Sequence, residues 1–170
     1  MKIAIHGPMC AGKTTISNII KEIDPEYKTY SFGLKVKDIA YDLFNMENKD
    51  RSLIINVASK MREINQNVWA EYVIREIKKD NNKKCIIDDL RFQNEADYLK
   101  DWNIICLTTP KDIRVQRIKT IYKENYEDHL KNMEHISETE KINLPENTIY
   151  IDTSIEYNEL KNRIQSIICV

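Results

Sequence analysis

The sequence has little glycine, little proline, no cluster of cysteines and no excess of basic charge. Its 170 residues include 3 Gly, 4 Pro and 4 Cys, and the formal net charge is −1. A domain that binds the phosphate backbone of nucleic acids usually carries a clear basic excess, so we expect no nucleic-acid partner. The widely spaced cysteines lack a CxxC pattern, which argues against disulfides and structural zinc and favours a reducing, cytoplasmic setting.

Long apolar runs are also missing. The amino-terminal segment MKIAIHG is too short for the apolar part of a signal peptide, and no apolar stretch approaches membrane-spanning length. We therefore expect an intracellular protein without a membrane partner. Apolar residues make up 42% and charged residues 31% of the chain, which indicates one ordinary globular domain over residues 1–170.

Strands and helices are predicted to alternate along the chain. Apolar and β-branched runs predict five strands, at Lys2–His6, Tyr27–Phe32, Lys84–Asp88, Asn103–Thr108 and Asn147–Asp152. Helical spacing predicts helices at Gly12–Ile23, Lys35–Phe44, Ser52–Met61, Val68–Lys79, Asn94–Asp101 and Glu156–Ile168, and a long helical region from Asp112. This alternation implies right-handed crossovers, so we expect a three-layer α/β/α fold around a five-stranded parallel sheet.

Two of the three glycines lie in one stretch, GPMCAGKTT at residues 7–15. Gly7 through Thr14 matches the phosphate-loop pattern G-x-x-x-x-G-K-[ST], directly after a predicted strand and at the start of a predicted helix. Backbone N–H groups and the helix dipole then converge on phosphate. Lys13 would reach the β- and γ-phosphates, and Thr14 would ligate Mg²⁺. The predicted ATP-binding residues are Gly7, Pro8, Met9, Cys10, Ala11, Gly12, Lys13, Thr14 and Thr15.

Cys10 has two interpretations. It is either a small residue that fills a tight turn, or a thiol whose pKa is lowered by the adjacent helix amino terminus. Modification of such a thiol would block nucleotide entry.

The remaining motifs favour a small kinase over other phosphate-loop proteins. The guanine-binding pattern NKxD is absent, because Asn48–Arg51 and Asn82–Cys85 lack Asp at the fourth position. The chain is also short for a motor ATPase with accessory domains. Phosphoryl transfer depends on charge neutralisation over donor and acceptor phosphates. Four arginines near predicted loops could supply it, namely Arg62, Arg91, Arg114 and Arg117.

One segment carries a more specific resemblance. The stretch DDLRFQNEAD at Asp88–Asp97 is similar to the DD-x-R-F-x-N-E-A segment of phage- and virus-type deoxynucleoside monophosphate kinases. Further matching pieces follow in order: Phe32–Phe44, Arg62 with Asn67 and Trp69, Arg114 with Arg117, and His135–Glu138. The resemblance implies transfer of the ATP γ-phosphate to a deoxynucleoside 5′-monophosphate, with an acceptor-binding insert at about 34–80 and a lid at about 112–141.

The resemblance also implies roles for individual residues. Asp88 would hold Mg²⁺ through water, and Asp89 would either assist it or cap a helix. The acceptor site would include Lys37, Arg62, Trp69, Arg91, Phe92 and Glu95, although Trp69 and Phe92 could equally belong to the core. Arg114 and Arg117 would clamp the transferring phosphoryl group from the lid. The predicted catalytic set is therefore Lys13, Arg62, Asp88, Arg91, Arg114 and Arg117, and the roles of His135 and Glu138 stay open.

Two other functions remain open. One is a phosphate-loop kinase with another acceptor, such as phosphomevalonate or dephospho-coenzyme A, and the other is an ATP-dependent binding switch. Lys35 stands where the resembled family has proline, which leaves base selectivity open. The richness in Ile, Lys and Asn suggests an AT-rich genome and favours a viral source, with the protein in the host cytoplasm. The sequence does not decide between a monomer and a homodimer, or between ribose and deoxyribose.

Overall fold

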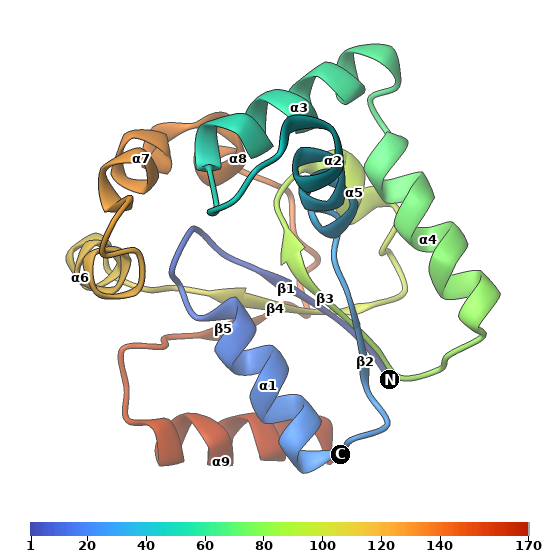
Figure 1. Ribbon diagram of the computed structural model, residues 1–170. Coiled ribbons are helices and arrows are strands. Elements are labelled where there is room, and N and C mark those ends of the chain that lie inside the picture. The colour runs from blue at the N-terminus through green and yellow to red at the C-terminus, as the bar shows by residue number, and fades with distance from the viewer. Residues whose placement is uncertain (170) are drawn as a thin grey trace.

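The fold is built on one parallel sheet of five strands (Figure 1). The computed structural model describes residues 1–169. The strands are β1 (Lys2–His6), β2 (Lys28–Tyr30), β3 (Cys85–Leu90), β4 (Asn103–Leu107) and β5 (Ile149–Ile151). Their order across the sheet is β2-β3-β1-β4-β5, and every neighbouring pair is parallel. The predicted α/β fold with a five-stranded parallel sheet is confirmed.

Helices cover both faces of this sheet (Figure 1). One face carries α1 (Lys13–Ile23) and α9 (Tyr157–Ile168). On the other side are α2 (Leu34–Phe44), α3 (Arg51–Ile64), α4 (Val68–Asp80) and α5 (Gln93–Asp97). The segment after β4 forms α6 (Lys111–Ile121), α7 (Tyr126–Lys131), the 3₁₀ helix η1 (Asn132–Glu134) and α8 (Ile136–Thr139). In Figure 1, α7 and α8 lie beside the amino-terminal end of α3.

The alternation of side chains along β1 separates the two largest clusters of the core. Ile3 and Ile5 pack with Ile16 and Ile20 of α1 on one face, and Ala4 belongs to the cluster on the other face. Successive strand residues point to opposite faces, so an apolar run such as Ile3–Ile5 suits a strand that is buried on both sides. All three side chains of this run are fully buried.

Several element boundaries differ from the predicted ones, and two differences matter for the site. Strand β3 continues to Leu90, so Asp88 and Asp89 lie within the strand instead of at its end. The pairing of β3 with β1 shifts register at these residues, because Ala4 pairs with Ile87 but His6 pairs with Leu90, and both carboxylates line the same cavity. The region predicted as one long helix from Asp112 is interrupted after Ile121 and continues as short helices.

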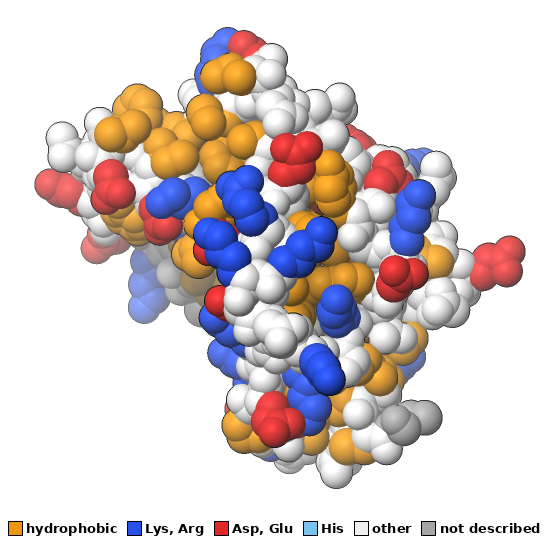
Figure 2. Space-filling model, turned by 90° about the vertical axis from the view of Figure 1, so that its right-hand side faces the viewer, with side chains coloured by type: hydrophobic (Ala, Val, Ile, Leu, Met, Phe, Trp, Pro, Cys, Tyr) orange, Lys and Arg blue, Asp and Glu red, His pale blue; other side chains and the backbone are white. Residues whose placement is uncertain are grey.

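Among residues 1–169, no helix is long and apolar enough to cross a bilayer. Figure 2 views the side on which α4 lies, where Lys and Arg side chains are interspersed with apolar and acidic ones. Helix α2 exposes several large apolar side chains, Leu34, Tyr41, Leu43 and Phe44.

Candidate active site

The loop between β1 and α1 has a backbone that only glycine adopts easily at its two ends. Gly7 has φ 156° and Gly12 has φ 96°. A Cβ atom at Gly7 would lie 3.0 Å from the Leu107 Cβ, and one at Gly12 would lie 3.4 Å from the Thr153 Oγ1. Gly12 also precedes the first residue of α1, so the loop leads directly into a helix amino terminus. The structure thus gives residues 7–12 the strand–loop–helix setting that the motif requires.

Side chains from two other strand ends hold the loop from behind. The hydroxyls of Thr109 and Thr153 both donate to the Ala11 carbonyl, at 3.2 and 2.6 Å. Arg117 of α6 donates to the carbonyls of Cys10 and Thr153, at 3.2 and 2.6 Å, and to the Thr153 hydroxyl at 3.1 Å. The loop is therefore fixed at its back, while its other side faces a cavity.

Lys13 folds back over the loop that precedes it. Its Nζ donates to the carbonyls of Gly7 at 2.6 Å and Pro8 at 2.8 Å. Burial, together with the nearby positive charge of Arg91, lowers the pKa of Lys13 to about 7. An anionic phosphate beside this ammonium would favour its charged form.

Cys10 does not have the activated thiol that one of its two interpretations required. Burial raises the pKa of this thiol, and the positive charges of Lys49 and Lys13 only partly oppose the effect. Cys10 lines the cavity, and its φ of 59° is in the left-handed region that non-glycine residues seldom adopt. Of the two interpretations, the structure therefore favours a small residue that fills a tight turn.

A single cavity of about 540 Å³ joins the loop to α2, α3 and the helices after β4. Its volume is in the range of small-molecule sites. The lining is strongly basic in a chain of net charge −1. The Lys and Arg residues that line it are Lys13, Lys37, Lys49, Arg51, Arg62, Arg91 and Arg117. The Asp and Glu residues that line it are Asp88, Asp89 and Glu95.

Asp88 faces this cavity together with Thr14 and Thr15. Burial and the neighbouring Asp89 raise the pKa of the Asp88 carboxyl to about 6, against the effect of Lys13 and Lys37. Among residues 1–169, no group of three or more His, Cys, Asp or Glu side chains could hold a metal by itself. A cation here would therefore need phosphate oxygens or water as further ligands, which fits the way Mg²⁺ is usually held beside nucleotides.

Asp89 also lines the cavity, but its carboxylate is engaged by the loop that leads into α2. Its carboxylate accepts from the backbone N–H groups of Phe32 at 2.9 Å and Gly33 at 2.8 Å, and from the Ser31 hydroxyl at 2.7 Å. A Cβ atom at Gly33 would lie 3.1 Å from this carboxylate, so the close approach favours glycine. Both oxygens are thus engaged by protein donors, and the geometry favours a structural role over the expected metal ligand.

The other end of the cavity contains Arg62, Phe92 and Glu95. The Arg62 guanidinium lies over the Phe92 ring at 4.2 Å from its centroid and donates to Glu95 at 3.3 Å. Glu95 is buried and also accepts the backbone N–H groups of Arg91 at 2.9 Å and Phe92 at 3.1 Å. Burial, and then the charge of Asp89, raises the pKa of Glu95 to about 7. Glu95 therefore orients Arg62 and fixes the turn that precedes α5.

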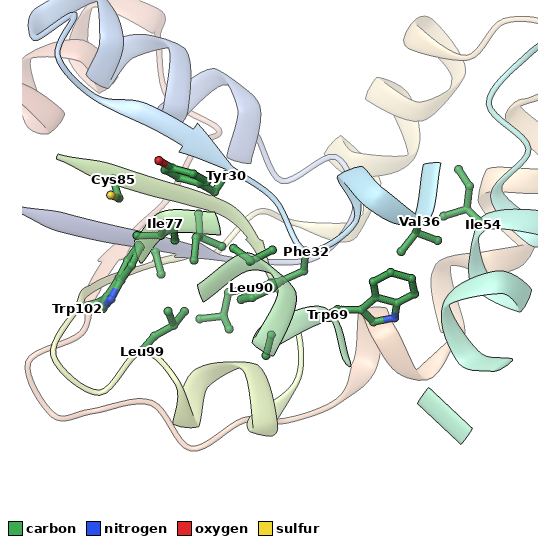
Figure 3. Close-up of a cluster of buried hydrophobic side chains, with 14 of the residues drawn as sticks. Tyr30, Phe32, Val36, Ile54, Trp69, Ile77, Cys85, Leu90, Leu99 and Trp102 are labelled. Atoms are coloured by element: carbon green, nitrogen blue, oxygen red, sulfur yellow. The ribbon is translucent and has the colours of Figure 1, made fainter. Parts of the chain in front are cut away.

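Trp69 does not line the cavity, whereas Lys37 does. Trp69 is 3% exposed, packs with Val36 and Ile54 in the core (Figure 3), and is absent from the cavity lining. Its indole N–H donates to the Ala58 carbonyl at 3.2 Å, so the polar end of the side chain is satisfied. The expected role of Trp69 in substrate binding is replaced by a role in the core. Lys37 of α2 lines the cavity as expected.

Arg91 meets a second arginine that the sequence analysis did not single out. Arg51, at the start of α3, and Arg91 both form ion pairs with the Glu138 carboxylate of α8. Arg91 also donates to the Ser137 carbonyl at 2.9 Å, and the Met9 N–H donates to Glu138 at 2.7 Å. Glu138 thus connects α8 to the phosphate loop and to both arginines.

The surroundings of α7 and α8 include further residues that the sequence did not indicate. Lys49 donates to the Tyr122 hydroxyl at 2.9 Å, and Tyr122 stacks on His129 with 3.7 Å between ring centroids. Among residues 1–169, two buried side-chain atoms lack a hydrogen-bond partner, the Nε of Arg51 and the Nε2 of His129. His135 caps α8, where its Nδ1 accepts the Ser137 N–H at 3.1 Å, and its ring lines the cavity.

The two arginines expected in the lid differ in position. Arg114 does not line the cavity, and its Nε donates to the Thr109 carbonyl at 3.2 Å. Arg117 lines the cavity, but its donors are directed to the back of the phosphate loop. Although both belong to α6, the helix therefore does not present them as a pair to a shared phosphoryl group.

Comparison with known proteins supports the fold and the phosphate loop. The model of a family described as an AAA domain matches residues 3–143. The chain is similar to the solved structure of shikimate kinase from Acinetobacter baumannii in complex with shikimate, with 19% identity and a TM-score of 0.57 over 99% of this chain and 92% of that one. No curated protein matches the chain.

Two further structures show the same architecture. A sugar kinase from a Janibacter species has 14% identity and a TM-score of 0.61, over 97% of this chain and 92% of that one. The APS kinase of Mycobacterium tuberculosis, in complex with AMPPNP and APS, has 10% identity and a TM-score of 0.57, over 99% and 97%. At these identities the likeness concerns the fold.

Proposed function

Since the chain belongs to this AAA domain family and has the fold of phosphate-loop small-molecule kinases, we propose that it transfers the γ-phosphate of ATP to a deoxynucleoside 5′-monophosphate. In this proposal, residues of about 34–80 form the acceptor-binding insert and those of about 112–141 form the lid. The proposal predicts small-molecule substrates and Mg²⁺ as the metal, and it keeps the expectation that nucleic acid and membrane are not partners.

The basic lining of the cavity carries the proposal. Seven Lys or Arg side chains face three acidic ones there, although the chain as a whole is slightly acidic. Such a concentration of charge is costly unless anions bind between the cations. ATP and a nucleoside monophosphate together bring enough negative charge to both ends of the cavity.

The acceptor end supports a phosphate joined to an aromatic base. Lys37, Arg62 and Arg91 offer cations for the monophosphate, and the Phe92 ring offers an apolar surface beside Arg62. Planar guanidinium groups suit the bidentate recognition of phosphate. The resemblance of residues 88–97 to the deoxynucleoside monophosphate kinases agrees with this arrangement, because it includes Arg91, Phe92 and Glu95.

The chemistry would be displacement at the γ-phosphorus. An oxygen of the acceptor phosphate forms the new P–O bond, the bond to the β,γ-bridging oxygen breaks, and its electron pair leaves with ADP. The attacking oxygen is already ionised, so no general base is needed. Mg²⁺ would be held by the Thr14 hydroxyl and, through water, by Asp88, and when bound it neutralises charge on the β- and γ-phosphates.

A kinase with a different small-molecule acceptor is the second candidate. The chain has only the fold in common with structures named for shikimate, sugar and APS kinases, and Lys35 departs from the resembled family within α2. Phosphomevalonate and dephospho-coenzyme A would also explain several of the cations. The comparisons give no support for a viral source or for a place in deoxynucleotide metabolism.

Steady-state turnover with a panel of acceptors tests the proposal. ADP release is measured with MgATP and each of the deoxy- and ribonucleoside monophosphates, and in parallel with shikimate, gluconate, phosphomevalonate and dephospho-coenzyme A. Lys13→Ala serves as the control for contaminating kinases. The proposal expects a deoxynucleoside monophosphate to give the highest kcat/KM. Turnover with another acceptor alone would favour the second candidate, and ATP hydrolysis unaffected by every acceptor would favour a switch.

A further inference from the structure

Glu138 joins two arginines from different segments at the middle of the cavity wall. Its side chain is fully buried, and it forms ion pairs with Arg51 from the start of α3 and Arg91 from the end of β3. One carboxylate thus balances two guanidinium groups, which leaves one positive charge at this point. The Glu138 carboxylate also accepts the Met9 N–H of the phosphate loop, which fixes this charge relative to the loop.

The two arginines face the cavity, and the carboxylate lies behind them. Arg51, Arg91, Met9 and Lys13 all line the cavity, whereas Glu138 does not. A ligand in the cavity would therefore meet the guanidinium groups first. Glu138 is in a position to orient them without competing for the ligand.

Arg51 retains donor capacity that the protein does not use. Its side chain is 12% exposed, and its buried Nε has no hydrogen-bond partner among residues 1–169. A buried charged donor without an acceptor is unfavourable, and such groups call for an explanation, such as a ligand that is bound at another stage. A phosphate has enough oxygens to accept from Arg51 and Arg91 together.

The location corresponds to the boundary between the two halves of the cavity. Met9 belongs to the phosphate loop, and Arg51, Arg91 and Glu138 are close enough to Lys13 to affect its pKa. Arg91 directly precedes Phe92 of the acceptor end. By contrast, the donors of Arg117 are directed to the back of the loop, and Arg114 lies outside the cavity.

We propose that Arg51 and Arg91 together contact the phosphoryl group during its transfer, and that Glu138 is the positioning residue for both. This inference rests on the proposed phosphoryl transfer, but not on the identity of the acceptor. As the bond to the bridging oxygen breaks, negative charge is spread over the γ-phosphoryl and leaving oxygens, and two guanidinium groups at this boundary neutralise it. In the absence of nucleotide, Glu138 reduces the repulsion between the two like charges.

Kinetics of Arg51 variants test the contact. Arg51→Ala should lower kcat by about 10³-fold, the lower end of the effects known for arginines that stabilise phosphoryl transfer. The KM values for ATP and the acceptor should change much less, because a contact strengthened in the transition state mainly affects kcat. Arg51→Lys should recover only a small part, since an ammonium lacks the planar fork. Added guanidinium should partly restore Arg51→Ala but not Lys13→Ala.

Glu138→Gln tests the positioning role, because it keeps the size of the side chain and removes its charge. We expect kcat to fall about 10- to 100-fold, the usual effect of losing a group that orients a site residue, with little change in either KM. Arg75→Ala, on the exposed side of α4, is the control and should match the wild type. Thermal unfolding of each variant checks that the fold is kept.

The outcomes separate this inference from the proposed function. Each variant is assayed with the acceptor that the wild type uses best and also for ATP hydrolysis without acceptor, in which water takes the phosphoryl group. A wild type that is inactive on monophosphates contradicts only the proposed function. A folded Arg51→Ala that keeps kcat within about threefold, or that raises only the acceptor KM, overturns the inference.

Discussion

The two ends of the cavity are built in different ways. The donor end is made largely from the backbone of one short stretch, residues 7–13, where two glycines allow the loop to close around a phosphate. The rest of the cavity, which includes the proposed acceptor end, is made from side chains of separate segments, and each is held by a buried or engaged carboxylate. Glu95 orients Arg62, Glu138 holds Arg51 and Arg91, and Asp89 fixes the loop before α2.

Because of this difference, the two ends should tolerate different amino-acid substitutions. A backbone-built site depends on φ angles and on the absence of Cβ atoms, and it accepts varied side chains such as Met9 and Cys10. A site built from side chains depends on charge pairs, and the loss of one carboxylate leaves a buried cation uncompensated. Variants at the two ends should therefore fail in different kinetic parameters.

Removal of the loop lysine should have the largest effect. Lys13→Ala deletes the single ammonium that the donor loop holds at its phosphate-facing side, so kcat should fall by about 10³-fold, as for other preorganised electrostatic contacts. The unfolding midpoint should stay within about 3 °C, because Lys13 belongs to none of the hydrophobic core clusters. A steady-state assay and a thermal melt together check this. Near-normal kcat would mean that the loop is only structural.

The Mg²⁺ requirement of the enzyme should depend on Asp88 and on its protonation. Asp88→Asn should raise the Mg²⁺ concentration for half-maximal activity by about 10- to 100-fold, as for other groups that act on a metal through its outer shell. The pKa of Asp88 is raised to about 6, so in the wild type the Mg²⁺ requirement should increase as pH falls through 6 and the carboxyl is protonated. Mg²⁺ titrations at several pH values check this. A wild-type requirement that is independent of pH would contradict it.

The pair Arg114 and Arg117 tests whether the back of the donor loop matters. Arg117→Ala removes three hydrogen bonds to Cys10 and Thr153, so the KM for ATP should rise by about tenfold, corresponding to about 1.4 kcal/mol. Arg114→Ala, from the same helix, should change it by less than about twofold, within the scatter of ordinary surface substitutions. Equal effects of the two variants would show that α6 acts as a clamp after all.

Gly33→Ala tests the acceptor loop without removing a charge. Its Cβ would lie 3.1 Å from the Asp89 Oδ2, so the loop or the carboxylate must shift. We expect the KM for the acceptor to rise about fivefold, close to 1 kcal/mol, while the KM for ATP stays the same. Both Michaelis constants measured on one preparation decide the matter. A change in the ATP constant alone would place this loop at the donor end.

Cysteine labelling should give the smallest effect and contains its own control. Cys10 lines the cavity and has a raised pKa, whereas Cys169 is exposed. Cys169 should react with iodoacetamide first, and MgATP should slow the labelling of Cys10 by a factor of about 3. Mass spectrometry of the two peptides measures both rates. Identical Cys10 rates with and without ATP would remove it from the nucleotide site.

The sequence predicted the donor end better than the acceptor end, for a physical reason. The phosphate loop is contiguous, so the residues that build it are neighbours in the chain and their pattern is visible. The five-stranded parallel sheet was predicted correctly for the same reason, since strand and helix periods are local. The acceptor end depends on side chains that only the tertiary fold brings together.

Particular residues show which features of the site the local sequence pattern did not predict. In the sequence, the segment Asn48–Arg51 matches no motif beyond an incomplete guanine pattern, yet Lys49 and Arg51 line the cavity. Trp69 matched a motif by spacing, but its side chain points into the core. Asp88 and Asp89 are adjacent and both line the cavity, yet the loop before α2 engages Asp89, at a point where the pairing of β3 with β1 shifts register. The residue type alone does not tell whether such a side chain lines the cavity, packs in the core or holds a loop.

All three glycines of the chain belong to this site, since Gly7 and Gly12 bound the donor loop and Gly33 contacts the acceptor-side carboxylate. Selective labelling with ¹⁵N-glycine would therefore give a nuclear magnetic resonance spectrum that contains the backbone amides of this site alone. Two of those signals would follow the nucleotide and one the acceptor, so binding at the two ends could be observed separately in a single sample. Because glycine is scarce in this chain, its amide signals alone would show in which order the two substrates bind.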